Sequence, residues 1–139
     1  MSIKGTKTTT SGMEWNTMLG LLVRLKNDNK LREYLLIATG CYFGLRIGDL
    51  LNLKWNQVLD KDEFTITESK TGKQRKITIN RSVKEAICYV ADTLTRQGVF
   101  NLDGYMFCNN RGGKLSRQFI NHLLAEAFRE YNCEYVRAS

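Results

Sequence analysis

The spacing of apolar residues indicates that the first third of the chain is helical. Apolar side chains recur every three or four positions between about residues 12 and 26, as on one face of an amphipathic helix. Residues 30–43 are apolar on most sides, which is typical of a helix buried in a core. A further amphipathic helix is expected after Arg46, because Ile47, Leu50 and Leu51 recur at roughly helical spacing and Trp55 can continue the repeat.

The period then changes to that of β-strands. Apolar and polar residues alternate over residues 63–68 and again over residues 75–80, and a polar segment, Ser69 to Gln74, separates them. This pattern predicts an antiparallel hairpin with a turn at its tip. A shorter strand can be accommodated near residues 57–59.

Helical spacing returns in the last third of the chain. Ser82 is a suitable cap for a helix that runs to about Arg96, and Ser116 for a last helix that runs to about Tyr131. The inward face of the last helix should comprise Phe119, Leu123 and Phe128. The fold class expected from the whole pattern is mainly α with a small antiparallel β-sheet, an α+β protein.

The amino-terminal residues do not share these patterns. Residues 1–10 are rich in Thr, Lys and Gly and lack apolar periodicity, so we interpret them as a flexible lead-in or the remnant of a linker. Order should begin at Ser11, which forms a capping-box pattern with Glu14. At 16.0 kDa the chain has room for one domain, which we expect to comprise residues 11–139.

The net charge narrows the class of partner. The chain has 21 Lys and Arg against 14 Asp and Glu, a net charge of +7, which favours a polyanion such as nucleic acid. A ribosomal or membrane-surface protein would have a similar composition. No apolar stretch has the length of a membrane span, and the amino terminus is polar rather than signal-like. We therefore expect a cytoplasmic protein with no membrane partner.

The cysteines do not indicate a metal site. Cys41, Cys88, Cys108 and Cys133 are scattered without the spacing of zinc ligands, and His122 is the single histidine. In a reducing cytoplasm we expect four free thiols that serve mostly as packing residues, and no bound metal or other cofactor.

Arg46 is the strongest candidate for chemistry. It follows Gly44, a residue that can close a helix in the left-handed conformation, and it precedes Asp49 in the first turn of the next helix. A guanidinium beside the free N–H groups of a helix start can bind a phosphate bidentately. The alternative is an ordinary surface arginine at the beginning of a helix.

A family resemblance favours the phosphate clamp. Residues 44–55, GLRIGDLLNLKW, resemble the first signature box of the tyrosine recombinase (phage integrase) family, which contains a glycine, an arginine, an acidic residue and a leucine-rich helix ending in tryptophan. Asp49 stands where most members have glutamate. Arg46 matches the arginine of the box.

The predicted hairpin turn resembles a second segment of that family. Residues 69–79, SKTGKQRKITI, are similar to the hairpin that carries a catalytic lysine, and Lys70 is at the matching position. Thr78 replaces a proline that many members have, and Lys73 remains a rival for the role. Without the resemblance, the four basic residues of this turn would equally fit a solvated loop.

The resemblance implies DNA breakage and rejoining through a 3′-phosphotyrosyl intermediate, without a cofactor. Arg46 would stabilise the charge that develops on the phosphate oxygens, and Lys70 would protonate the departing 5′ oxygen. The expected partner is double-stranded DNA, and the expected DNA contacts are Lys73, Arg75, Lys76, Arg111, Lys114 and Arg117.

Other parts of the family pattern do not match. Members carry a His-x-x-Arg box and later a nucleophilic tyrosine, but Ala125 follows His122 by three positions. Neither Tyr131 nor Tyr135 follows such a box, so we interpret them as a packing residue and part of a tail. We expect a truncated front portion of the catalytic domain, from a shortened product or an interrupted reading frame, that is inactive alone and self-associates through uncovered apolar surface.

Two other hypotheses remain open on the sequence. The chain could be a noncatalytic DNA-binding or regulatory module built on the same scaffold. It could also be a basic helical protein whose partner is RNA or another protein.

Overall fold

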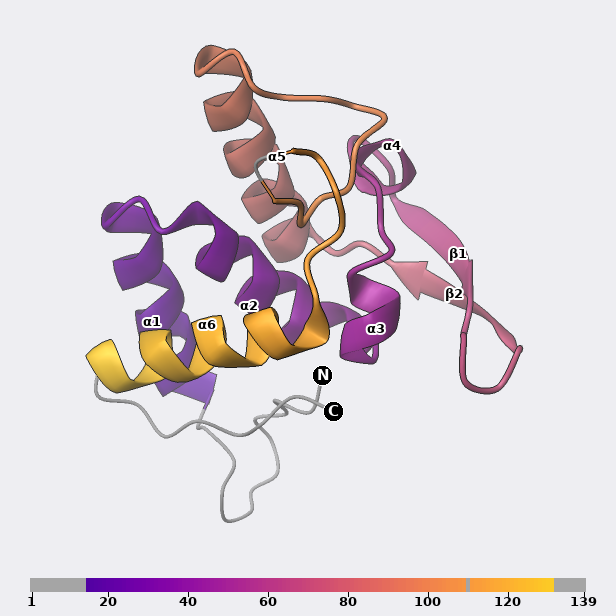
Figure 1. Ribbon diagram of the computed structural model, residues 1–139, viewed down its shortest axis with the longest axis horizontal. Helices are drawn as coiled ribbons and strands as arrows, with labels where there is room; N and C mark the ends of the chain where they lie inside the picture. Colours follow the sequence, from indigo (N-terminus) through magenta and orange to yellow (C-terminus); the bar gives the residue numbers. More distant parts are fainter. Residues whose placement is uncertain (1–14, 110, 132–139) are drawn as a thin grey trace. The chain divides into compact units, whose positions relative to one another are not determined.

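The computed structural model describes residues 15–109 and 111–131. It confirms the predicted fold class, because the described elements are helices and one two-stranded antiparallel sheet (Figure 1). The expected lead-in at residues 1–10 and the cap at Ser11 lie outside the described residues. The elements are α1 (Trp15–Asn27), α2 (Leu31–Phe43), α3 (Ile47–Leu50), α4 (Trp55–Val58), β1 (Glu63–Thr67), β2 (Gln74–Thr78), α5 (Arg81–Arg96) and α6 (Arg117–Glu130).

These elements form two compact units. The first contains the described residues up to Ile47 together with those from Ser116 onward, and the second contains residues 48–115. The first unit is therefore built from α1, α2 and α6, and the second holds the hairpin, α4 and α5.

In the first unit, α2 packs against both α1 and α6 (Figure 1). Leu36 and Ile37 at the centre of α2 are fully buried, as the almost uniformly apolar sequence predicts. Leu21 and Leu25 of α1 are also fully buried, at the helical spacing expected for its inward face.

The inward face of α6 differs from the prediction. Phe128 is buried as expected, but Phe119 is 40% exposed and Leu123 is only half-buried. The buried stripe consists instead of Ile120, Leu124, Ala127 and Phe128. Since this stripe and the predicted one both have helical spacing, apolar content alone could not decide which neighbouring position faces the core.

The second unit contains the predicted hairpin. Strands β1 and β2 pair antiparallel, with Phe64 opposite Ile77 on the buried face. Helix α5 follows, but its cap is Asn80 rather than Ser82: the Asn80 Oδ1 accepts the Val83 N–H at 3.0 Å. Asparagine and serine are about equally good helix caps, so residue type alone could not decide between Asn80 and Ser82.

The helix predicted after Arg46 is present from Ile47, but it does not extend to Trp55. Helix α3 ends after four residues, and the chain then extends before α4 begins. The reason is a partner far along the sequence, because the Met106 N–H donates to the Leu53 carbonyl at 3.0 Å and the Trp55 N–H donates to the Gly104 carbonyl at 3.1 Å. The strand suggested at residues 57–59 is also wrong, since α4 occupies most of that segment.

No helix in the described part of the chain combines the length and the apolar character that crossing a membrane requires.

Candidate functional site

Arg46 lies at a corner between two helices. Helix α2 ends at Gly44, whose φ of 66° is in the left-handed region that a residue without a Cβ adopts at low cost. Leu45 and Ile47, on either side of the arginine, are fully buried, whereas Arg46 itself is exposed. The buried neighbours fix the backbone, so the guanidinium is presented to solvent from a defined position.

Lys70 lies in the turn between β1 and β2, at the free end of the hairpin (Figure 1). The Gly72 N–H donates to the Glu68 carbonyl and the Glu68 N–H donates to the Lys73 carbonyl, both at 2.8 Å. The Thr71 hydroxyl also donates to the Glu68 carboxylate at 2.9 Å. The turn is thus closed by its own hydrogen bonds while the side chains of Lys70 and Lys73 remain exposed.

Asp49 ties this turn to α3. The Ser69 N–H donates to the Asp49 Oδ1 at 3.1 Å, across a separation of 20 positions. Asp49 is 5% exposed, and its Oδ2 is buried with no hydrogen-bond partner in the described part of the chain. Burying a carboxylate costs free energy, and the hydrogen bond from the Ser69 N–H offsets part of that cost. Sequence reasoning placed Asp49 in the matching box but missed this contact.

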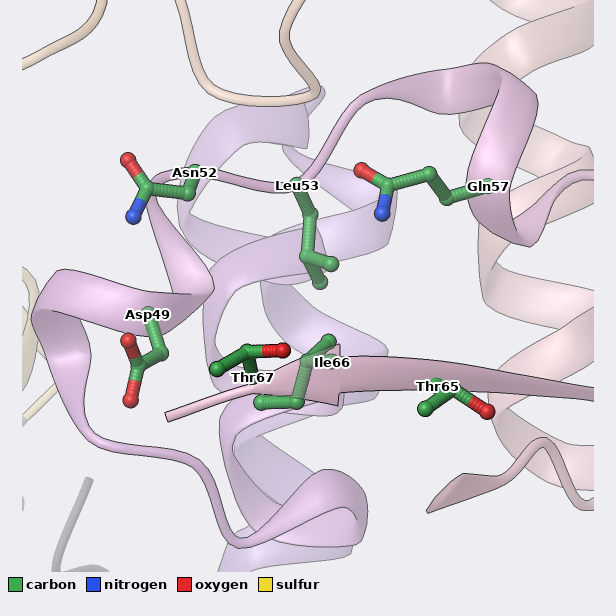
Figure 2. A pocket seen from close by; sticks show the side chains of 7 residues that line it. All are labelled: Asp49, Asn52, Leu53, Gln57, Thr65, Ile66 and Thr67. Carbon is green, nitrogen blue, oxygen red and sulfur yellow. The ribbon is translucent and has the colours of Figure 1, made fainter. Parts of the chain in front are cut away.

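A pocket of about 210 Å³ adjoins the same carboxylate. Figure 2 shows Asp49 and Asn52 at one end of this pocket and Gln57 and Thr65 at the other, with Leu53 between them. The pocket lies within the second unit, between the segment after α3 and strand β1. Polar side chains and two aliphatic side chains, Leu53 and Ile66, therefore line the pocket beside the anchor of the hairpin turn.

The basic residues of the hairpin fall into two groups. Arg75 forms an ion pair with Glu68 at 3.2 Å, and Lys76 forms one with Glu63 at 3.4 Å. Lys70 and Lys73 form no ion pair with any carboxylate that the structure describes. Two of the four hairpin cations are therefore partly neutralised by the protein itself.

The other predicted DNA contacts lie in two places. Arg111 and Lys114 belong to one turn of the second unit, where the Asn109 Oδ1 accepts the Arg111 N–H at 2.8 Å and the Gly113 N–H at 3.0 Å. Arg117 is exposed in the first turn of α6, in the first unit.

Tyr131 lies in a polar cluster of the first unit. Its hydroxyl donates to the Asp28 carboxylate, and Arg24 lies 5.3 Å from its ring centroid. Lys30 lies 5.6 Å from the same centroid and forms an ion pair with Glu130 at 2.5 Å. The bond to Asp28, aided by desolvation, raises the pKa of Tyr131 to about 12. Tyr135 lies outside the described residues.

The raised pKa of Tyr131 predicts a loss of stability at high pH. The folded state favours the neutral phenol, so the contribution of the Tyr131–Asp28 bond is complete below the unfolded pKa of about 10 and disappears as the pH approaches about 12. Tyr131→Phe should therefore be less stable than the wild type by a constant amount up to about pH 10, and the difference should vanish over the next two units.

Urea denaturation at a series of pH values would measure this difference. Asp28→Asn keeps an acceptor but removes the charge, so it should move the transition back toward the ordinary tyrosine range. A difference between Tyr131→Phe and wild type that does not change with pH would contradict the assignment of the hydroxyl bond.

The other residues considered in the sequence are His122 and the cysteines. His122 is exposed on α6 and its Nε2 lies 3.4 Å from the Glu126 carboxylate. Cys41, Cys88 and Cys108 form no disulfide among the described residues, and desolvation raises the pKa of Cys41 to about 12; Cys133 lies outside the described residues. Over the described ranges, no three His, Cys, Asp or Glu side chains gather in a group that could hold a metal ion.

Comparison with known proteins covers almost the whole sequence. The model of the phage integrase family matches residues 13–138. A probable integrase/recombinase of Methanocaldococcus jannaschii is 27% identical over 116 residues, which is 83% of this chain and 34% of that protein. A probable integrase/recombinase of Bacillus subtilis is 48% identical over 63 residues, 45% of this chain and 34% of that protein. The chain thus spans about a third of the length of the curated relatives it matches.

The fold agrees with this sequence match. The solved structure of the XerH site-specific recombinase, bound to its difH substrate in a pre-cleavage complex, superimposes with a TM-score of 0.69. At 17% identity the match covers 96% of this chain and 40% of that chain, so it supports the fold alone. The sequence match over nearly all of the chain carries the family assignment: this protein belongs to the phage integrase family, the tyrosine recombinases.

Proposed function

We propose that this chain forms part of a site-specific recombinase that breaks and rejoins double-stranded DNA through a 3′-phosphotyrosyl intermediate. The family assignment supports the reaction class, and the DNA-bound XerH complex with the same fold supports the partner. The net charge of +7 supplies the attraction to a polyanion that such binding needs.

In this proposal Arg46 and Lys70 act on the scissile phosphate. A deprotonated tyrosine oxygen attacks phosphorus and forms the new P–O bond, the bond from phosphorus to the 5′ oxygen breaks, and the lysine ammonium gives its proton to that oxygen. Arg46 stabilises the negative charge on the nonbridging oxygens. The observation that carries the proposal is the turn of Lys70, which is anchored by Asp49, three residues after Arg46 in the same signature box.

The DNA contacts follow from the pairing of the cations. Lys73 and Arg111 are exposed and can reach phosphates directly, whereas Arg75 and Lys76 must first exchange a carboxylate partner for one. We assign Lys73 and Arg111 the larger share of the binding energy. Lys114 and Arg117 complete the set.

Binding to DNA provides the test. Arg46→Ala and Lys70→Ala should each weaken binding to a 20–30 base-pair duplex by about tenfold, since each removes a charge-assisted contact to phosphate. Fluorescence anisotropy across a salt series, with duplex RNA in parallel, would measure the affinities. Lys61→Ala removes an equally exposed lysine of the second unit and serves as the control. Equal affinity for RNA and DNA would argue against a recombinase.

A nicked duplex that traps phosphotyrosyl adducts separates this proposal from a noncatalytic module. We propose that the chain by itself forms no adduct, because no arginine follows His122 by three positions and the Tyr131 hydroxyl is bonded to Asp28. A covalent complex with the 139-residue chain would refute this part. If the chain extended by a His-x-x-Arg box and a tyrosine of the family pattern still formed no adduct, the noncatalytic module would be favoured.

A further inference from the structure

Three segments of the second unit meet at the ring of Tyr105. The Lys54 Nζ lies 5.2 Å from the ring centroid and the Lys114 Nζ lies 6.0 Å from it. Both distances are within the range over which an ammonium is attracted to an aromatic face. Two positive charges that are 60 positions apart in the sequence thus share one ring.

Backbone pairing holds these segments in place. Lys54 and Tyr105 face each other in an isolated antiparallel bridge, and Lys114 forms a second bridge with Cys108. The Lys114 Nζ also donates to the Asn52 Oδ1 at 2.6 Å. The lysines and the ring are therefore attached to paired backbone rather than to a free loop.

The cluster has excess positive charge. Neither Lys54 nor Lys114 forms an ion pair with a carboxylate of the described residues, and the Oδ1 of Asp103 accepts the Asn56 Nδ2 at 3.2 Å. The ring offsets part of the repulsion between the two ammonium groups but does not neutralise them. An anion between the lysines would relieve the repulsion and accept their remaining N–H groups.

We propose that Lys54, Tyr105 and Lys114 form a phosphate cradle that binds one phosphodiester of the backbone of duplex DNA. The proposal rests on the DNA binding proposed above and extends it, since only Lys114 was expected from the sequence. Both ammonium groups donate to the phosphate oxygens, and the half-exposed phenol can donate a third hydrogen bond. Arg111, exposed on the turn that leads to Lys114, favours a chain of regularly spaced phosphates over a single carboxylate.

The salt dependence of binding tests whether both lysines serve one phosphate. Lys54→Gln and Lys114→Gln should each weaken binding to duplex DNA by about tenfold, and the double variant should lose little more, because either loss opens the same cradle. The slope of log K against log salt should fall by about 0.9 in the double variant, the value for one phosphate contact. Lys61→Gln is the matched control, and Lys54→Arg with Lys114→Arg should restore binding.

The outcomes separate the cradle from the function on which it rests. If wild type fails to bind duplex DNA, the proposed function fails and the cradle fails with it. If wild type binds and the double variant matches Lys61→Gln, the cradle alone is refuted. Equal competition by polyglutamate of the same total charge would show an unspecific anion site and overturn the assignment to a phosphodiester. Tyr105→Leu should lower affinity as the lysine variants do; unchanged affinity would exclude the ring.

Discussion

Phe128→Ala should lower the free energy of unfolding by about 3–5 kcal/mol, the largest effect we expect from a single core substitution in this chain. Phe128 is 1% exposed near the carboxyl end of α6, and the stripe to which it belongs closes the core of the first unit. Truncation to alanine removes the buried ring and leaves a cavity that neighbouring side chains fill only in part. Urea denaturation followed by circular dichroism would give the difference.

Phe119→Ala is the matched control for this prediction. The residue type and the helix are the same, but Phe119 is 40% exposed, so its loss should change stability by less than about 0.5 kcal/mol. Its backbone N–H still donates to the Ser116 hydroxyl at 3.1 Å, which leaves the helix cap intact. Similar losses in the two variants would mean that the register assigned to α6 is wrong.

The elements predicted well are those whose pattern is local and long. Helices α1, α2 and α5 each repeat their apolar spacing over at least 13 residues, and the hairpin alternates on both sides of a turn with Gly72 at φ 72°. Such patterns reflect the geometry of the element itself. Two of the errors, the stripe of α6 and the cap of α5, are at places where two local interpretations were equally good.

The break between α3 and α4 could not be predicted in this way. Leu53 and Trp55 fit a helical repeat, but their backbone groups pair with Met106 and Gly104, about 50 positions away. Backbone hydrogen bonds to a distant segment therefore determined the structure here, and the local helical spacing did not. The same pairing places Lys54 opposite Tyr105. The sequence analysis therefore missed the backbone pairing and the proposed cradle for one physical reason.

In the candidate site, too, the residues in local motifs were predicted and the contact between distant segments was not. Arg46 and Lys70 were identified because each lies in a local motif, and the helix-closing Gly44 and the glycine turn are readable from neighbouring residues. The contact between Asp49 and the backbone of Ser69 joins two motifs that the sequence presents separately. The sequence analysis placed Asp49 in the first turn of a helix, where a carboxylate complements the positive helix end, and that placement gave no indication of its partner.

Asp49→Ala should release the turn that carries Lys70. The Ser69 N–H loses a carboxylate acceptor, so its exchange with water should rise by about 10- to 100-fold, the range expected for a hydrogen bond to a charged group. The Gly72 amide, which donates to the Glu68 carbonyl at 2.8 Å within the turn, should change much less. Water-exchange NMR of the two amides would measure both rates in one sample.

Asp49→Asn distinguishes the hydrogen bond from the charge. Asparagine keeps an oxygen that can accept the Ser69 N–H, so exchange should stay within about threefold of wild type. The variant also removes a charge from a site that is 5% exposed and whose second oxygen has no partner among the described residues, so its free energy of unfolding should equal or exceed that of wild type.

The two Asp49 variants also connect the turn to DNA binding. If a fixed turn is what directs Lys70 toward phosphate, Asp49→Ala should weaken duplex binding toward the level of Lys70→Ala, while Asp49→Asn should bind as wild type does. Fast exchange at Ser69 with unchanged DNA affinity would show that the anchor serves folding alone. Equal exchange in the alanine and asparagine variants would mean that the backbone of the turn holds its position without the carboxylate.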